Sequence, residues 1–277
     1  MAPAEQVAHY AVVGNPITHS LSPQIHNSFA AQTGEALSYR AIELPLGGFA
    51  PGIRDLQNRG FAGVNVTVPF KGEARNLCDS LSARAERAGA VNTLSFETDG
   101  GIAGDNTDGL GLTRDLRDNL GIEIKQREIL LLGAGGAVRG VLDPLLALSP
   151  ARLTIANRTP AKASQLARDF ADCGNTEALA FEALDGREFD LVINGTAAGL
   201  EHAVPAIPAS VMHQQTVCYD MMYNVEGATA FVGWARDRGA ARAFDGLGML
   251  VEQAAAAFEI WRGVKPDSAT VIQSLRA

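Results

Sequence analysis

The sequence predicts an α/β protein in which strands and helices alternate, organised as two domains. Two observations indicate this fold class. Short apolar runs typical of buried strands recur along the chain, and capped or amphipathic helical segments separate them, an order that favours largely parallel sheets covered by helices. The length of 277 residues, with 47% hydrophobic and 19% charged residues, suits one large or two modest globular domains.

In the first half of the chain, strands are predicted over 7–14, 37–44, 61–68 and 90–98, and helices over 22–34 and 47–60. Ser22 is expected to be the N-cap of the first helix, with Pro23 in its first turn and Gly34 as its stop. The second helix is the weaker prediction, because Pro51 and Gly52 interrupt its pattern.

A glycine-rich seam over 100–121 separates this half from the next. A helix begins within the seam, with apolar positions at Leu110, Leu112, Leu116 and Leu120. After it, strands are predicted over 127–133, 152–158, 190–196 and 216–223, and helices over 137–149, 160–171, 228–239 and 248–263. The last of these helices carries an apolar stripe formed by Leu250, Ala254, Ala257, Phe258 and Trp261.

Charge and composition exclude several classes of partner. The net charge of −8 argues against a nucleic-acid binder, which would carry a basic surface. Cys78, Cys173 and Cys218 are far apart in sequence, so we expect inert thiols and a reducing cytoplasm rather than disulfides or zinc. The N-terminal stretch lacks the pattern of a signal peptide, and no window approaches the roughly 18 apolar residues of a membrane span.

The stretch 129–140, ILLLGAGGAVRG, predicts a dinucleotide-binding turn between a strand and a helix. Gly133 permits the tight turn, and Gly135 allows a backbone to approach a pyrophosphate closely at the helix N-terminus. Val138 occupies the third glycine position of the usual pattern, so the match is incomplete. An ordinary strand-to-helix turn is the alternative, which the complete βαβ context makes the weaker interpretation.

The end of the next predicted strand favours NADP(H) over NAD(H). An NAD-binding chain offers Asp or Glu there to the ribose 2′-hydroxyl, whereas this chain has Asn157, Arg158 and Thr159. A guanidinium can pair with a 2′-phosphate that a carboxylate would repel. Lys162 is a possible helper. The alternative for both basic residues is a solvated position on the surface.

Polar residues at the ends of elements predict a site for a polyhydroxylated acid. In open α/β sheets, ligands bind beyond the carboxyl ends of the strands. Hydroxyls and a lysine suit a carboxylate, whereas amides and an aspartate suit substrate hydroxyls. The residues in question are Ser20, Ser22, Asn65, Thr67, Lys71, Asn92 and Asp108.

Each of these residues also has an ordinary structural interpretation. Ser22 and Asp108 can cap helices, Asn92 can belong to a turn, and Thr67 is common strand content. Taken singly, each structural alternative carries at least as much weight as the functional interpretation. Their occurrence together, beside a predicted nucleotide-binding half, favours a common site.

The chain resembles the shikimate dehydrogenase family from about residue 10 to its end. The motifs that carry the resemblance keep the family's order and separations: GNPITHSLSP, NVTVPFK, AVNT, GDNTDG, GAGGA, NRT, NGTAAGL and DGLGMLVEQAAAAFEIWRG. The motifs NVTVPFK and GDNTDG are specific, because general dinucleotide-binding proteins lack them.

The resemblance implies an N-terminal parallel-sheet substrate domain, a Rossmann-type NADP-binding domain and a cleft between them. The substrate domain would comprise 1–107, completed by the C-terminal helices 247–277, and the NADP domain 108–246. The expected activity is the NADP-dependent interconversion of 3-dehydroshikimate and shikimate in chorismate and aromatic amino acid biosynthesis. The expected protein is a cytoplasmic monomer or homodimer that needs no metal and binds neither nucleic acid nor membrane.

Residue roles follow from the same resemblance. The catalytic pair would be Lys71 and Asp108. Substrate would be bound by Ser20, Ser22, Asn65, Thr67, Asn92, Tyr223 and Gln253. NADP(H) would be bound by Gly133, Ala134, Gly135, Gly136, Ala137, Asn157, Arg158, Thr159, Lys162, Met221 and Gly246. Two residues depart from the family pattern: Val225 replaces a common proline, and Val138 replaces a smaller residue and is expected to crowd the helix slightly.

Elementary chemistry explains why Lys71 would be needed. Reduction of a ketone delivers a hydride to carbon and develops charge on oxygen, which a nearby ammonium can stabilise and protonate. Asn65 and Thr67 share a strand face, and Lys71 begins the next predicted helix beside that strand end. The alternatives are a dehydrogenase for quinate or an amino analogue, and a non-catalytic NADP(H) sensor. Arg158 argues against an NAD-preferring quinate enzyme, Ser20 and Tyr223 should exclude quinate's extra hydroxyl, and the retained catalytic pair argues against the sensor.

Overall fold

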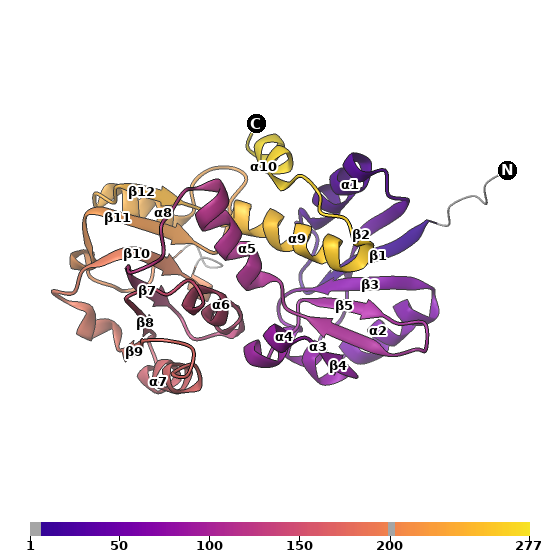
Figure 1. Ribbon diagram of the computed structural model, residues 1–277, viewed down its shortest axis with the longest axis horizontal. Coiled ribbons are helices and arrows are strands. Elements are labelled where there is room, and N and C mark those ends of the chain that lie inside the picture. Colours follow the sequence, from indigo (N-terminus) through magenta and orange to yellow (C-terminus); the bar gives the residue numbers. More distant parts are fainter. Residues whose placement is uncertain (1–6, 199–202) are drawn as a thin grey trace. The chain divides into compact units, whose positions relative to one another are not determined.

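The computed structural model of the chain describes residues 7–198 and 203–277, and these form two compact units. The first unit comprises the chain up to Gly111 together with Val251–Ala277, and the second comprises Leu112–Leu250. Each unit contains a six-stranded sheet with helices on both faces (Figure 1), so the predicted two-domain α/β class is confirmed. The divisions fall inside two helices, α5 (Asp108–Arg114) and α9 (Leu247–Arg262), rather than in loops.

The sheet of the first unit is parallel except for one strand. Its strand order is β2-β1-β3-β5-β6-β4. Strand β5 runs antiparallel to both of its neighbours, whereas the remaining pairs are parallel. The strands are β1 (Ala8–Gly14), β2 (Leu37–Glu43), β3 (Phe61–Val66), β4 (Ser80–Leu81), β5 (Thr93–Phe96) and β6 (Ile102–Asp105). The sequence did not predict β4 and β6, and β6 lies in the segment interpreted as a glycine-rich turn and seam.

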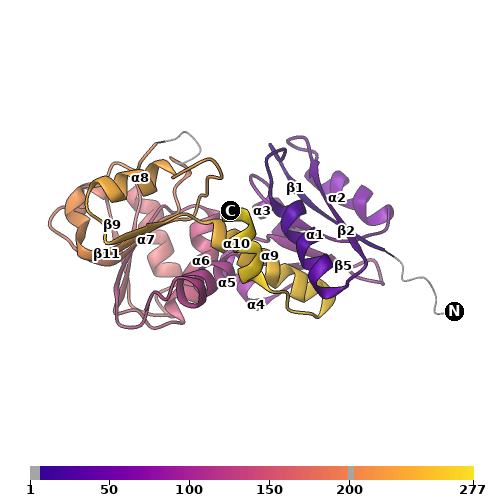
Figure 2. The same ribbon diagram turned by 90° about the horizontal axis from the view of Figure 1, so that it is seen from above.

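Alternating residues of β1 divide the first unit into two apolar layers. Ala11 and Val13 pack with the helices α2 (Phe49–Asn58), α3 (Lys71–Leu77) and α4 (Ala83–Ala88). Tyr10 and Val12 face the other side, where α1 (Ser22–Thr33) and α9 lie side by side (Figure 2) and the ring of Phe29 meets that of Phe258 at 5.7 Å. A further helix, α10 (Ser268–Arg276), follows α9 within the segment 247–277, for which C-terminal helices were predicted.

Two predictions about helix ends in this unit were wrong. Ser22 is the first helical residue of α1 rather than its N-cap, which is Leu21, and the Ser22 N–H donates to Ser20 Oγ at 3.3 Å. Pro51 does not interrupt α2, because it lies in the first turn, where backbone N–H groups have no helical partner. Gly34 does end α1, in the left-handed conformation with φ of 74°.

The sheet of the second unit is entirely parallel, with the strand order β12-β11-β10-β7-β8-β9. This is the Rossmann order, because successive strands are added outward on each side of the β7/β10 pair, which makes that pair the switch point. The strands are β7 (Glu128–Leu132), β8 (Arg152–Ala156), β9 (Thr176–Leu179), β10 (Phe189–Asn194), β11 (Met212–Asp220) and β12 (Arg242–Phe244). The short edge strands β9 and β12 were not predicted.

Helices cover both faces of the second sheet. Ile129 and Leu131 pack against α6 (Gly136–Leu146) and α7 (Pro160–Asp169), together with Leu112 and Leu116 of the helix predicted in the seam. Leu130 and Leu132 face α8 (Ala230–Asp237) and the short turn η2 (Phe181–Leu184). A π-helical turn, η1 (Asp115–Asn119), follows α5, and a further short turn, η4 (Ala209–Val211), precedes β11.

The helices within 7–198 and 203–277 are all too short or too polar to cross a bilayer.

Candidate active site

The antiparallel strand β5 collects the polar residues of the first unit at one edge of its sheet. Asn65 pairs with Thr93, and Thr93 pairs with Asp105, so the three lie in one row across β3, β5 and β6. Strands β3 and β6 end in this row, whereas β5 begins there because it runs the other way. Asn92, just before β5, and Asp108, which begins α5 three residues after the end of β6, therefore meet beyond the same edge.

Lys71 and Asp108 form an ion pair at this edge. Lys71 is the first residue of α3, and its Nζ lies 2.5 Å from Asp108 Oδ2. The Lys71 side chain is 20% exposed and that of Asp108 7%, so the ammonium is the more accessible partner. A partly buried pair of this kind keeps a proton donor in a fixed place while leaving it open to a ligand.

The side-chain amide of Asn92 joins three segments of the chain. Its Nδ2 donates to Asp108 Oδ1 at 2.8 Å and to Thr107 Oγ1 at 2.9 Å, and lies 3.3 Å from Gln253 Oε1 of α9. Its Oδ1 accepts from the Thr107 N–H at 2.9 Å and from Thr93 Oγ1 at 2.8 Å. Asn92 is 2% exposed, so it is more than the turn residue of the alternative interpretation.

Asn65 is held in a single amide orientation. Its Nδ2 donates to the Asn92 carbonyl at 3.2 Å and to Thr93 Oγ1 at 3.1 Å. A carbonyl oxygen can only accept, so the nitrogen must face it. Asn65 Oδ1 then accepts from the Tyr39 hydroxyl at 2.7 Å.

Tyr39 and His26 form a buried stack beside Asn65. Their rings lie 4.1 Å apart with an interplanar angle of 3°. Burial raises the pKa of Tyr39 well above 10, an effect that a hydrogen bond with Ser22 opposes in part, so the hydroxyl keeps the proton that it donates. Burial also lowers the pKa of His26 to about 3, against an opposing hydrogen bond with Asn65, so the ring is neutral at physiological pH.

The structure joins Asn65, Lys71, Asn92, Asp108 and Gln253 through these hydrogen bonds, and Ser22 lies near Tyr39, which donates to Asn65. The other two predicted residues of this unit have different surroundings. Ser20 Oγ accepts from the Ser22 N–H. Thr67 lies just beyond β3, and its methyl group packs against Gly14, where an added Cβ would lie 2.6 Å away.

The turn between β7 and α6 in the second unit fits the predicted binding of a pyrophosphate. Gly133 has φ of 109°, a conformation that favours glycine. Gly135 is the N-cap of α6, and a Cβ added at Gly135 or Gly136 would meet no described protein atom within 4 Å. The packing of the protein therefore does not itself require glycine at these two positions, whereas the close approach of a ligand to the helix N-terminus would.

Val138 does not crowd the first turn of α6 as predicted. Its side chain is fully buried, and its Cγ2 would lie 3.1 Å from a Cβ added at Gly133 and 2.6 Å from one added at Gly195. Glycine at both positions makes room for the valine. The departure from the usual pattern at 138 is thus matched by Gly195 at the end of β10.

The residues predicted to choose the cofactor follow β8 directly. Asn157 donates from Nδ2 to the Thr159 carbonyl at 3.0 Å, which shapes the turn. Arg158, Thr159 and Lys162 are exposed. No carboxylate stands in this turn, so its side chains suit a phosphate better than a ribose hydroxyl.

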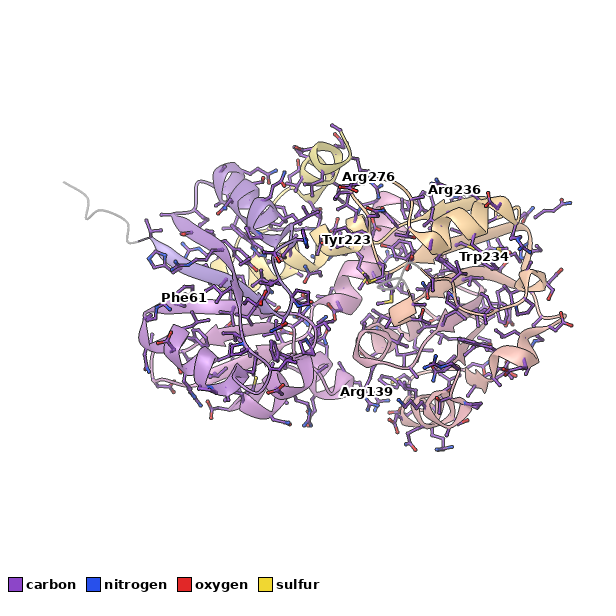
Figure 3. All side chains as sticks on the ribbon, turned by 180° about the vertical axis from the view of Figure 1, so that it is seen from behind. Phe61, Arg139, Tyr223, Trp234, Arg236 and Arg276 are labelled. Carbon is purple, nitrogen blue, oxygen red and sulfur yellow. The ribbon has the colours of Figure 1, made fainter. Side chains whose placement is uncertain are left out.

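Met221 and Gly246 meet at the carboxyl edge of the same sheet. The Met221 N–H donates to the Asn194 carbonyl at 2.8 Å, and a Cβ at Gly246 would lie 2.5 Å from the Met221 carbonyl oxygen. Tyr223 lies on the loop after β11, and Trp234 lies beyond it on α8 (Figure 3). In the motif NGTAAGL, the residues Gly199 and Leu200 lie outside the described part of the chain.

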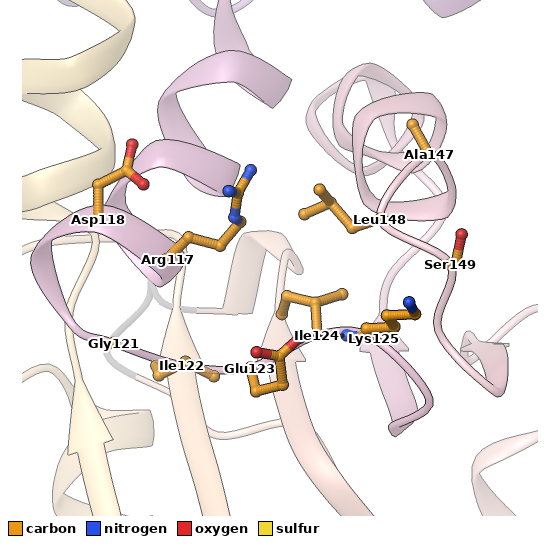
Figure 4. Close-up of a pocket in the computed structure, with 10 residues that line it drawn as sticks. All are labelled: Arg117, Asp118, Gly121, Ile122, Glu123, Ile124, Lys125, Ala147, Leu148 and Ser149. Atoms are coloured by element: carbon orange, nitrogen blue, oxygen red, sulfur yellow. Dashed lines mark hydrogen bonds between the residues drawn. The ribbon is translucent and has the colours of Figure 1, made fainter.

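A separate cavity of about 570 Å³ lies in the second unit (Figure 4). Its lining includes Lys125, which precedes β7, and Ser149, which precedes β8. It therefore opens at the amino ends of these strands, opposite the edge at which ligands of such sheets bind. None of the predicted site residues lines it.

The sequence interpretation missed Tyr39, Thr93 and Thr107, which hold the predicted residues in place. Thr107 lies inside the quoted motif GDNTDG, and Thr93 inside AVNT, so the motifs themselves were the available signal. Tyr39 gave no comparable signal, because an aromatic residue in a strand is typical of core packing.

Family models match three parts of the chain. Residues 12–94 match the shikimate dehydrogenase substrate binding domain, and residues 115–214 match the family described as shikimate / quinate 5-dehydrogenase. Residues 246–276 match the shikimate 5′-dehydrogenase C-terminal domain.

Curated relatives match nearly the whole chain. A shikimate dehydrogenase (NADP(+)) of Thioalkalivibrio sulfidiphilus is 57% identical over 267 residues, which are 96% of this chain and 97% of the relative. One of Hahella chejuensis is 55% identical over 96% of this chain and 98% of the relative.

Solved structures show the same fold. An Ael1 enzyme from Pseudomonas putida has a TM-score of 0.91 and 46% identity, with 98% of both chains covered. The shikimate 5-dehydrogenase of Thermus thermophilus in complex with NADP(H) and shikimate has a TM-score of 0.85 and 33% identity, with 98% of this chain and 99% of that chain covered.

The contact between Val138 and Gly195 predicts a coupled effect on stability. Gly195→Ala should lower the free energy of unfolding by about 1–3 kcal/mol, because its new Cβ would overlap the Val138 methyl. Val138→Ala in the same chain should recover part of this loss, and thermal unfolding of both single variants and the double variant measures the coupling. Additive losses would show that the two residues do not compete for this space.

Proposed function

This chain belongs to the shikimate dehydrogenase family, and we propose from that premise how its residues interconvert 3-dehydroshikimate and shikimate. The enzyme is an NADP-dependent oxidoreductase of chorismate and aromatic amino acid biosynthesis. The observation that carries the residue assignment is the Lys71–Asp108 pair, fixed by Asn92 at the edge of a sheet. NADPH supplies the hydride that reduces the substrate ketone, and NADP⁺ accepts it in the reverse direction.

Lys71 is proposed to move the proton. In the direction of reduction, its ammonium donates a hydrogen bond to the ketone oxygen and gives that oxygen a proton as charge develops there. Asp108 keeps Nζ in place through the 2.5 Å contact, and Asn92 keeps the carboxylate in place through the 2.8 Å contact. In the direction of oxidation, the neutral amine takes the proton of the same hydroxyl.

Substrate binding is proposed for the polar residues around this pair. Asn65, held in one orientation at the end of β3, is assigned to a ring hydroxyl that persists in both substrate and product. Asn92 and Gln253 lie next to Asp108 and suit neighbouring hydroxyls. Ser20 and Ser22, at the start of α1, are assigned to the carboxylate, with Thr67 as a further contact. Tyr223 of the second unit stays a substrate contact implied by the family resemblance alone.

NADP(H) binding is proposed for the carboxyl edge of the second sheet. Its pyrophosphate would lie against Gly133–Ala137, where the open faces of Gly135 and Gly136 support close approach. The exposed turn Asn157–Lys162 would bind the 2′-phosphate, chiefly through Arg158. Met221 and Gly246 would border the nicotinamide. We assign the first unit to the substrate and the second to the cofactor.

The cellular setting is also a proposal. Cys78, Cys173 and Cys218 are free thiols, and burial raises the pKa of Cys218 to about 12. Such thiols suit a reducing compartment, so we assign the enzyme to the cytoplasm. We expect it to be a monomer or a homodimer there.

The test of the activity is turnover of shikimate with NADP⁺ by the purified chain, followed at the absorbance of NADPH. Quinate with NAD⁺ is the comparison, because it separates the proposed enzyme from a quinate dehydrogenase. Failure to reduce NADP⁺ in the presence of shikimate, by a folded chain that binds NADP⁺, would contradict the proposed activity.

Lys71→Ala should lower kcat by about 10²–10⁴-fold, because it removes the proposed proton donor. The Kd for shikimate should change much less, since the interaction is strongest in the transition state. Asp108→Asn should also lower kcat, and the double variant should lose far less than the product of the single losses. Lys125→Ala is the matched control, because Lys125 is exposed and lies outside the proposed site. A kcat for Lys71→Ala within a few-fold of the parent contradicts the proton transfer.

Arg158→Ala should lower kcat/KM for NADP⁺ at least about tenfold, equivalent to roughly 1.4 kcal/mol. The same substitution should leave kcat/KM for NAD⁺ nearly unchanged. The physical reason is the loss of a charge-assisted bond to the 2′-phosphate at an open site. Arg168→Ala provides the control, because Arg168 is also an exposed arginine of the second unit. Its guanidinium donates a hydrogen bond to Gln165 on α7. Equal losses with both cofactors would assign Arg158 to the adenosine or to the fold instead.

A further inference from the structure

Asp220 is a buried carboxylate that the proposed mechanism does not use. It is the last residue of β11 and is 0% exposed. Its Oδ1 accepts from Asn194 Nδ2 at 3.0 Å and from the Met222 N–H at 3.2 Å, and its Oδ2 accepts from Thr229 Oγ1 at 2.6 Å. Burial raises its pKa, and these hydrogen bonds oppose the rise.

The three donors belong to three different parts of the second unit. Asn194 ends β10, Met222 lies at the start of the loop after β11, and Thr229 lies at the loop's end as the N-cap of α8. One carboxylate therefore fastens both ends of the loop 221–229 to the neighbouring strand. Burying a carboxylate costs free energy unless hydrogen bonds replace those it made to water. An apolar side chain would fill the same space without that requirement, so packing alone does not explain Asp220.

The same contacts fix Met221, which follows Asp220 directly. Its N–H donates to the Asn194 carbonyl at 2.8 Å, and the Gly246 N–H donates to the Met222 carbonyl at 2.9 Å. A Cβ at Gly195 would lie 2.9 Å from the Met221 sulfur, so the side chain rests against the turn after β10. Asn194 thus holds Asp220 through its side chain and Met221 through its backbone.

We infer that Asp220 is a positioning residue for hydride transfer. Its carboxylate holds the loop 221–229 in place and thereby fixes the position of Met221 at the carboxyl edge of the sheet. The nicotinamide would pack against Met221 there. This inference rests on the proposed function, which assigns Met221 to the nicotinamide. A small displacement of a reacting group lowers the rate of the chemical step more than it lowers affinity.

Three variants and two controls separate positioning from simple stabilisation. Asp220→Ala removes all three acceptor contacts. Asp220→Asn keeps the shape and can donate to Thr229 Oγ1, so it should be milder. Thr229→Val removes the donor at 2.6 Å and also the acceptor of the Val232 N–H at the start of α8, so Thr229→Ser, which keeps both contacts, is its matched control. Asp190→Ala is the control, because Asp190 also accepts a backbone N–H, that of Glu128 at 2.9 Å, but lies near the amino end of β10.

The first measurement needs no cofactor and no turnover. Amide hydrogen exchange of the ligand-free chain should become at least about tenfold faster across 221–229 in Asp220→Ala, because the Met222 N–H loses its acceptor and the loop its anchor. Asp190→Ala should leave exchange in this loop at the parental rate. Unchanged exchange in Asp220→Ala would overturn the inference, whatever the activity of the variant.

The second measurement is the single-turnover oxidation of bound NADPH by saturating 3-dehydroshikimate. Its amplitude reports the folded fraction and its rate constant reports the assembled site. The rate constant should fall at least about tenfold in Asp220→Ala and less in Asp220→Asn, with Asp190→Ala at the parental value. A loss of amplitude with the parental rate constant would show a merely structural role.

Two further outcomes keep the inference distinct from the proposed function. If Asp220→Ala does not fold, Thr229→Val and Asp220→Asn carry the same test, and parental rate constants in both would overturn the inference. If the parent chain itself does not oxidise NADPH with 3-dehydroshikimate, the proposed function fails. Hydrogen exchange would still decide whether Asp220 fastens the loop.

Discussion

The site in the first unit depends on the side-chain amide of Asn92. The side-chain nitrogen donates to Asp108, and the side-chain oxygen accepts from the Thr107 N–H and the Thr93 hydroxyl. The backbone carbonyl of the same residue accepts from the amide of Asn65. Every one of these bonds is buried, where an unmatched polar group costs about 1–3 kcal/mol. The arrangement is therefore nearly all-or-none, and it gives Lys71 a rigid partner rather than a carboxylate that can rotate away.

The antiparallel direction of β5 is the feature of the fold that makes this possible, and periodicity does not reveal it. The apolar residues of 90–98 predict a strand in either direction, because the side-chain period is two in both. Long, well-buried elements such as β7, α6 and α9 were predicted nearly as they occur. The two-residue strand β4 and the three-residue strand β12 were not, since so few residues carry no periodic signal and take their conformation from the neighbouring strand.

The sequence predicted the ionisable and amide residues of the site more readily than the residues that orient them. Lys71 and Asp108 were recognisable because they lie within the motifs NVTVPFK and GDNTDG. Tyr39 and Asp220 were not singled out. An aromatic residue in a strand is usually core, and a carboxylate at a strand end is usually solvated. Only the folded structure reveals that Tyr39 donates to Asn65 and that Asp220 is fully buried beneath three donors.

The groups assigned to the substrate in the first unit differ in burial and bonding from those assigned to the cofactor in the second. In the first, hydrogen bonds already link Asn65, Asn92 and Gln253, so the directions of these three side chains are set before a ligand arrives. In the second, the pyrophosphate is assigned to backbone groups at glycines, and the 2′-phosphate to exposed side chains after β8. An exposed arginine can be replaced without leaving a buried polar group unpaired. Replacing Asn92 would instead break several buried hydrogen bonds at once. Cofactor preference in this chain should therefore change by single substitutions, while substrate preference requires coordinated changes across β3, β5 and the start of α5.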